Sequence, residues 1–256
     1  MWVYLYPNNT ETELKNAYIG EYVEPDYLCF TANTAGSTIL LRKWGSPTIT
    51  LEKSIDGVNW STYTWGTVGT YTDWEKITLT NIWDNVYFRN TSTTTTTFTT
   101  STSSPYNFII TWSISSSWDI WYLLNKNSTT SLSGNYCFYQ LFRGQPITSA
   151  PILSATSLTS RCYQEMFYGC TSLNTIPSLP ATILTTACYI DMFNGCTNIK
   201  LSATKTWSYQ TEYRIPSEWT WTVWTNSLTN MFYSTWWTFT WTPTINTTYY
   251  TSNTVV

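Results

Sequence analysis

The chain has 256 residues, of which 42% are hydrophobic and 11% charged, with a formal net charge of −3. This hydrophobic content argues against global disorder, and the low charge argues against a nucleic-acid partner, which requires a concentrated basic face. Histidine is absent, which excludes catalytic systems built on a histidine base and removes the commonest metal ligand.

Residues 1–26 form a polar, acidic lead-in, which we interpret as a segment that docks to a larger particle. A single short helix is expected over residues 11–17. The segment has no basic start followed by an apolar stretch, so no secretory signal is predicted in this chain. No run approaches the roughly 18 apolar residues that a membrane span requires, so we expect no membrane insertion.

Residues 27–125 are predicted to form a β-sandwich. Turn residues separate short segments of β-branched and aromatic residues, and strands of this spacing favour two packed sheets. Asp56-Gly57 predicts a hairpin tip, and Gly45-Ser46-Pro47 and Asp84-Asn85 predict further turns. The expected strands are residues 27–32, 38–43, 48–55, 75–80, 86–90, 106–111 and 120–124.

Residues 91–104 are nearly all threonine and serine. One interpretation is a flexible or glycosylated linker, and the other is a long loop or exposed hairpin within the β-sandwich. We favour the second interpretation, because a strand pattern resumes at Tyr106 and threonine suits exposed strands.

A nine-residue unit recurs within residues 126–200. Its two best copies are Cys162-Tyr163-Gln164-Glu165-Met166-Phe167-Tyr168-Gly169-Cys170 and, one step of 188 − 162 = 26 residues later, Cys188-Tyr189-Ile190-Asp191-Met192-Phe193-Asn194-Gly195-Cys196. A divergent copy begins at Cys137, and a last partial copy spans residues 226–233. A fixed period in this range predicts stacked units, none of which can bury its apolar side alone. We expect the Met-Phe pairs to stack in layers and the Cys-Tyr-x-x-Met-Phe stretch to form a short helix or turn.

These residues carry a family resemblance. The unit Met-Phe-x-Gly-Cys-Thr-x-Leu, followed by Leu-Pro-Ala-Thr, resembles BspA-type leucine-rich repeats over roughly residues 137–200. The resemblance implies a short leucine-rich-repeat solenoid behind the β-sandwich, closed by a Trp- and Thr-rich cap over residues 201–256. Such repeats occur on surface proteins of gut and oral bacteria and in proteins of their phages. The family's members adhere and lack an active site, so the resemblance implies adhesion.

Five of the six cysteines stand at two repeat positions. Cys137, Cys162 and Cys188 share one position, and Cys170 and Cys196 share the other. The alternatives are a disulfide staple, a thiolate metal site, or a ladder of buried thiols that pack as small hydrophobic groups. We favour buried thiols, because the repeat explains the spacing and zinc prefers two close pairs.

Glu165 and Asp191 also share a repeat position, and stacked units would bring them close together. They could form a calcium ligand pair or the acid and nucleophile of a glycosidase. We favour a solvated outer face instead, because Gln140 holds the same position in the first copy.

Sixteen tryptophans accompany only 10 glycines, and three interpretations compete. Aromatic residues that alternate along a strand could form a sugar-binding platform, with Trp219, Trp221, Trp237, Phe239 and Trp241 as its candidate ligand-binding residues. The tryptophans could instead serve core packing or a subunit interface. In the third interpretation, stop codons reassigned to glycine in the source were translated as tryptophan. Several tryptophans fall in turns that favour glycine or are otherwise compatible with this third interpretation: Trp83, Trp112, Trp118, Trp207 and Trp219.

The patterns together predict a non-enzymatic binding or structural protein without cofactor, metal or catalytic residues. We favour a phage virion component such as a fibre, decoration or adhesin subunit, because virion proteins assemble in the cytoplasm and need no secretory signal. The alternatives are a bacterial cell-surface adhesin and a carbohydrate-binding module with an aromatic platform. Expected partners are other virion or surface proteins, host glycans or a receptor, and a second copy of the chain.

Overall fold

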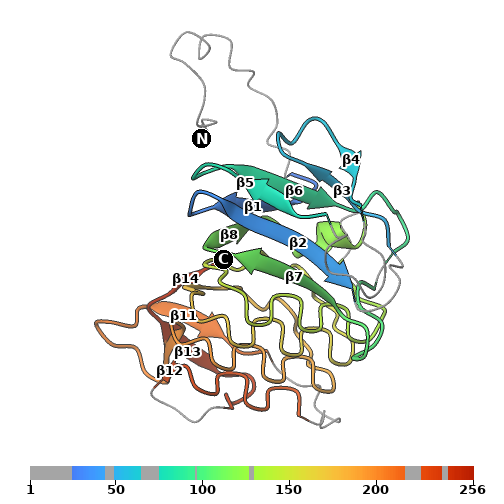
Figure 1. Ribbon diagram of the computed structural model, residues 1–256. Coiled ribbons are helices and arrows are strands. Elements are labelled where there is room, and N and C mark those ends of the chain that lie inside the picture. Colours follow the sequence, from blue (N-terminus) through green and yellow to red (C-terminus); the bar gives the residue numbers. More distant parts are fainter. Residues whose placement is uncertain are drawn as a thin grey trace, which may run out of the picture.

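The computed structural model describes residues 25–43, 49–64, 75–95, 97–126, 130–216, 226–237 and 242–256. These residues form mainly short strands in four sheets, two of them antiparallel throughout, with a single 3-10 helix (Figure 1). None of the described helical structure is long and apolar enough to cross a membrane. The helix predicted over residues 11–17 and the turn at Gly45-Ser46-Pro47 lie outside the described residues.

Two antiparallel sheets make up the first half of the described chain. One sheet has the strand order β4-β3-β6-β1-β8 and the other has the order β5-β2-β7. The sheets face each other, since Phe30 of β1 and Phe108 of β7 have ring centroids 4.7 Å apart. The strands are β1 (Leu28–Ala32), β2 (Ser37–Lys43), β3 (Glu52–Ser54), β4 (Ser61–Thr62), β5 (Ile77–Leu79), β6 (Asn85–Arg89), β7 (Tyr106–Thr111) and β8 (Ile114–Ser117).

The strand predictions over 27–32, 38–43, 75–80, 86–90 and 106–111 are confirmed within one or two residues at each end. The strand predicted over 48–55 is confirmed for Glu52–Ser54. The alternation of apolar and polar residues explains this success: in β2, every second side chain is buried between the sheets.

The strand predicted over residues 120–124 is wrong. Residues Ile120–Leu123 form the 3-10 helix η3, because the side chain of Asp119 caps it by accepting a hydrogen bond from the Trp121 amide at 2.8 Å. The sequence analysis missed β8, whose three consecutive serines carry no strand signal. Backbone pairing of β8 with β1 forms this strand.

The described residues of the Thr- and Ser-rich segment over 91–104 form a loop, as favoured above. It is not a free linker, because Phe98 is fully buried and its ring lies 4.6 Å from that of Tyr106. The backbone N–H of Thr99 donates to the carbonyl of Cys137 at 2.8 Å. The loop therefore belongs to the packed interior between the sheets and the first repeat copy.

Four turn segments, residues 136–145, 161–170, 187–196 and 226–235, lie stacked below the sheets (Figure 1). Within a segment, every second N–H closes a tight turn, as Gln164 does on the carbonyl of Arg161 at 3.3 Å. The intervening N–H groups donate to the next segment, as Tyr163 does to Cys188 at 3.0 Å. Successive turns, rather than a helix, therefore form the repeated unit, and both sets of amides are satisfied.

Aromatic rings run through the stack in two columns. In the longer column, neighbouring centroids are 5.3–5.6 Å apart and the ring planes differ by 10° or less; its members are Phe108, Phe142, Phe167, Phe193 and Phe232. In the shorter column the spacing is 5.7 Å, and its members are Phe138, Tyr163 and Tyr189. This confirms that Met166-Phe167 and Met192-Phe193 pack in successive layers.

The first turn segment and the residues after it cover one edge of each sheet. The Phe108 amide of β7 donates to the carbonyl of Leu141, and the Thr148 amide donates to the carbonyl of Ile114 in β8, each at 2.9 Å. Strands β7 and β8 are the edge strands of their sheets, so these bonds leave neither edge free for aggregation. A single hydrophobic cluster runs through sheets and stack, across the boundary predicted near residue 125.

The chain makes an excursion before the fourth turn segment and ends by returning to the stack. The excursion contributes to a four-stranded sheet of order β11-β13-β10-β12. At the C-terminal end of the chain, β14 (Thr254–Val255) pairs in parallel with β9 (Thr175–Ile176). The sheet consists of β10 (Lys200–Ser202), β11 (Thr211–Arg214), β12 (Trp236–Trp237) and β13 (Thr248–Thr251).

Candidate functional site

The predicted aromatic platform falls where the structure gives no side-chain description. Trp219, Trp221, Phe239 and Trp241 lie outside the described residues, and of Trp237 only the backbone is described, in β12. The sugar-binding platform therefore stays a prediction.

The residues that recur in the repeat units are structural. All eight predicted positions are fully buried: Cys162, Met166, Phe167, Cys170, Cys188, Met192, Phe193 and Cys196. The intervening apolar residues Leu173, Ile176, Leu179 and Leu184 are also buried. None of these side chains is available to a ligand, so a binding surface must be sought elsewhere.

The cysteines are buried free thiols, as favoured from the sequence. Burial raises the pKa of Cys137 and of Cys170 to about 12, because the charged thiolate would lose its hydration. The Cys170 thiol donates to the carbonyl of Phe142 at 2.9 Å. Among the described residues, no cluster of three acidic, cysteine or histidine side chains is placed to hold a metal ion.

A ladder of polar side chains follows one position of the four turn segments: Gln140, Glu165, Asp191 and Asn230. Each of these residues has a left-handed backbone, with φ between 52° and 57°. Such a conformation suits asparagine and aspartate and is costly for longer side chains. The stack thus imposes this geometry regardless of residue type.

The solvated outer face predicted for Glu165 and Asp191 is wrong, because both side chains are half-buried and partnered. Glu165 accepts a hydrogen bond from Gln140 at 2.9 Å and forms an ion pair with Arg143. Asp191 accepts from Asn194 at 2.7 Å, and burial raises the pKa of Asp191 above its usual value. The contacts of Glu165 tie two adjacent turn segments together, whereas the bond of Asp191 to Asn194 lies within one segment.

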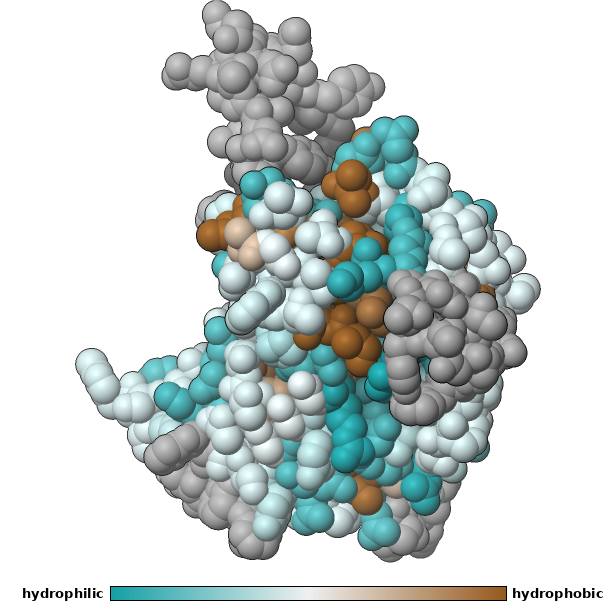
Figure 2. Space-filling model, in the orientation of Figure 1, coloured by the Kyte–Doolittle hydropathy of each residue, from teal (hydrophilic) through white to brown (hydrophobic). Residues whose placement is uncertain are grey.

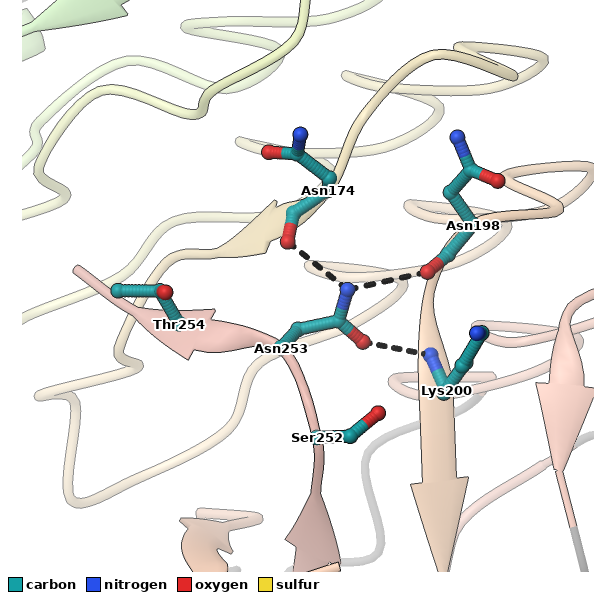
Figure 3. A pocket seen from close by; sticks show the side chains of 6 residues that line it. All are labelled: Asn174, Asn198, Lys200, Ser252, Asn253 and Thr254. Carbon is teal, nitrogen blue, oxygen red and sulfur yellow. Dashed lines mark hydrogen bonds between the residues drawn. The ribbon is translucent and has the colours of Figure 1, made fainter. Parts of the chain in front are cut away.

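A polar cavity of about 380 Å³ opens where the C-terminal strand meets the stack (Figure 3). The side-chain amide of Asn253 donates to the carbonyls of Asn174 at 2.8 Å and Asn198 at 3.0 Å, and its oxygen accepts from the Lys200 amide at 2.8 Å. Through these bonds the Asn253 side chain, which lines the cavity, holds the C-terminal strand against two successive connections of the stack, at Asn174 and at Asn198. The cavity is thus best explained as a structural seam.

The β3–β4 hairpin presents two apolar side chains at its tip, with Ile55 70% and Val58 78% exposed. The Asp56 carboxylate holds the loop by accepting from the amides of Val58 at 2.9 Å and Asn59 at 2.7 Å. These hydrogen bonds hold the pKa of Asp56 well below its usual range. Gly57 supplies the left-handed residue, with φ of 73°, so the predicted Asp56-Gly57 tip is confirmed.

A half-buried aromatic cluster flanks this tip. The Arg89 guanidinium lies 3.9 Å from the ring centroid of Trp60. The ring of Tyr27 lies 5.8 Å from that of Trp60 and 4.8 Å from that of Tyr87. The cluster adjoins the tip, because a Cβ at Gly57 would lie 3.7 Å from the Tyr87 ring. We call the exposed tip and this cluster the hairpin-tip face.

Sequence reasoning missed the hairpin-tip face, because its aromatic residues come from separate segments of the five-stranded sheet. Figure 2 shows apolar groups gathered over the two sheets, whereas the stack below presents mostly polar groups. Exposed apolar groups on a rigid support are typical of interaction sites. Among the described residues, the hairpin-tip face is therefore the strongest candidate for a binding surface.

Comparison of the chain with protein-family models, curated proteins and solved structures finds no match. The site must therefore be interpreted from its own chemistry.

Proposed function

We propose that this chain is a non-enzymatic binding or structural protein displayed on a surface, as a fibre, decoration or adhesin component of a phage virion. In this proposal the two facing sheets are a β-sandwich. The stacked turn segments are a short solenoid of BspA-like leucine-rich repeats, and residues 201–256 form its cap. The sandwich carries the contact surface, and the repeat stack serves as a stiff spacer.

The observation that supports this function best is the preorganised hairpin tip. Ile55 and Val58 stand in water although burial of either would be favourable, and Asp56 fixes the loop before any partner arrives. A loop that is already ordered loses little conformational entropy on binding. Tryptophan, tyrosine and arginine, which lie beside the tip, are the residues that dominate binding energy at protein interfaces.

Two further observations favour the virion over an exported protein. The six cysteines are free, which suits a chain that folds in a reducing cytoplasm. The continuous core of sheets and stack also suits a load-bearing particle component. The alternatives are a bacterial cell-surface adhesin and a carbohydrate-binding module, for which the half-buried rings of Trp60 and Tyr27 would provide aromatic contacts.

The proposal is tested by a binding experiment on purified protein and host cells. The double variant Ile55→Asp with Val58→Asp should reduce binding at least about tenfold, which corresponds to about 1.4 kcal/mol. Ile82→Asp, at a half-exposed isoleucine on the β5–β6 turn, is the matched control and should bind normally. If the double variant binds as well as the control, the hairpin-tip face is not the contact surface.

Location and ligand class are tested separately. Peptides of this chain should be found in purified phage particles and be absent from the host envelope fraction. The opposite distribution would support the cell-surface adhesin. Binding to a glycan array that is lost on Trp60→Ala would support the carbohydrate-binding module.

A further inference from the structure

Three tryptophans occupy left-handed backbone conformations. The φ angle is 74° at Trp83, 63° at Trp112 and 68° at Trp118. A bulky side chain at such an angle is an outlier, because its Cβ crowds the following carbonyl. Glycine has no Cβ and adopts these angles freely. The backbone at all three positions is thus shaped for glycine.

Hydrogen bonds and chain path require this backbone. In the turn between β5 and β6, the Trp83 amide donates to the Ala32 carbonyl at 2.9 Å. Trp112 lies in the two-residue link through which the chain leaves β7 and enters β8 in the other sheet. The Trp118 carbonyl accepts from the Ile152 amide at 3.0 Å, which joins the end of β8 to the stack. The turns belong to the fold and would persist with any residue.

The indole rings at these positions contribute no contact that explains their presence. Trp83 is 71% and Trp112 66% exposed, and Trp118 is half-buried; within the described ranges none of the three rings makes a hydrogen bond or an aromatic contact. Trp121 is different, because it is 2% exposed and its ring nitrogen donates to Asn125 at 3.3 Å. Trp121 is therefore a core residue, whereas the other three are not.

The other left-handed residues have ordinary explanations. Asn226, Asn230, Asn246 and Asp191 are of the types that tolerate this region. The remaining left-handed side chains of the stack stand at repeated positions of the turn segments, where the bonding between coils imposes the angle. The three tryptophans lie outside this pattern. Trp207, also suspected from the sequence, is 96% exposed but does not have a left-handed backbone.

We propose that the natural protein carries glycine at positions 83, 112 and 118, because its source translates UGA codons as glycine. UGA differs by one base from the tryptophan codon UGG, and variant genetic codes assign it either to tryptophan or to glycine. Translation with the first assignment places tryptophan where the source inserts glycine. A cell that reads UGA as a stop codon would truncate the chain, and only a cell whose transfer RNAs decode UGA as glycine would make the glycine form, which restricts the possible hosts.

The codons of the gene provide the first test. Positions 83, 112 and 118 should be UGA, and Trp121, whose ring is buried and hydrogen-bonded, should be UGG. Finding UGG at the three left-handed positions would overturn the proposal. Finding UGA at position 121 as well would also overturn it, because glycine there would empty the core.

Mass spectrometry of protein purified from its source provides the second test. The tryptic peptide over residues 77–89 contains Trp83, and the peptide over 90–126 contains Trp112, Trp118 and Trp121. The first should be lighter by one Trp-to-Gly difference and the second by two, with fragment ions that retain tryptophan at position 121. Peptides with the masses of the written sequence would refute the proposal even if the codons are UGA.

Discussion

Truncation of one ring in the longer aromatic column should destabilise the whole protein. Phe167 is fully buried and lies between Phe142 and Phe193, with centroids 5.6 Å away on both sides and planes within 5° of its own. The substitution Phe167→Ala removes a buried ring and leaves a cavity, at a typical cost of about 3–5 kcal/mol. Two stacking contacts, each worth roughly 0.5–1.5 kcal/mol beyond burial, place the expected loss near the upper end, at about 5 kcal/mol.

This loss is a large share of the roughly 5–15 kcal/mol by which a typical protein is stable. It should be measured by urea unfolding, with hydrogen exchange followed for β1, β7 and the turn segments. Because Phe108 of β7 begins the same ring column and one core joins sheets and stack, protection should fall in the strands as well as in the turn segments. The control is Tyr168→Ala at the next residue. The Tyr168 ring is half-buried and its centroid lies 4.5 Å from the Arg143 guanidinium, so its removal should lower the free energy of unfolding by about 1 kcal/mol.

Two results would refute this reasoning. If Phe167→Ala costs no more than Tyr168→Ala, the ring column does not stabilise the fold. If the turn segments lose protection while β1 and β7 keep theirs, the sheets fold independently of the stack.

Three further predictions concern the C-terminal clamp, the glycine-shaped turns and the thiols. Asn253→Ala, which removes the bonds of the clamp, should cost about 1–3 kcal/mol and expose the last strand to proteolysis, whereas Asn198→Ala, which keeps the carbonyl that the clamp uses, should change little. Trp118→Gly should raise the free energy of unfolding by about 1 kcal/mol in urea titrations, because the strain of a left-handed side chain is removed. Trp121→Gly should lower the free energy of unfolding by about 3–5 kcal/mol, and a lower free energy of unfolding for Trp118→Gly would contradict the strain. Burial raises the pKa of Cys137 and Cys170 to about 12 from an ordinary 9.0, so stability is fully present below pH 9 and should fall as pH rises toward 12. A urea midpoint that does not decrease over this range, or rapid thiol alkylation of the folded protein near pH 8, would show that the thiols are accessible.

The sequence predicted the parts of the fold whose physics is periodic. Alternating burial identified most strands of the two sheets, and the repeated Met-Phe pairs identified the layers, because aligned copies can bury their rings only against each other. The Asp56-Gly57 tip was predictable because a left-handed glycine and a capping carboxylate act within a few residues.

What the sequence did not predict depends on contacts between distant segments. The apolar run after Asp119 suits a strand or a helical turn equally well, and the Asp119 cap selected the turn. Strand β8 is serine-rich and exists because β1 pairs with it. The aromatic cluster beside the hairpin tip joins Tyr27, Trp60 and Tyr87, whose separation along the chain contains no signal that they meet.

The excursion before the fourth turn segment shows how such a molecule could acquire new loops. The step from Cys188 to Ser227, its counterpart one coil on, is 227 − 188 = 39 residues, against 26 for the preceding step. The additional residues leave the layer intact, since Phe193 and Phe232 still stack at 5.3 Å. The turn segments thus stay aligned across a connection that is longer by 39 − 26 = 13 residues. A foreign epitope or enzyme inserted at Trp207, which is 96% exposed in this excursion, should therefore be carried as a passenger by an otherwise unchanged framework.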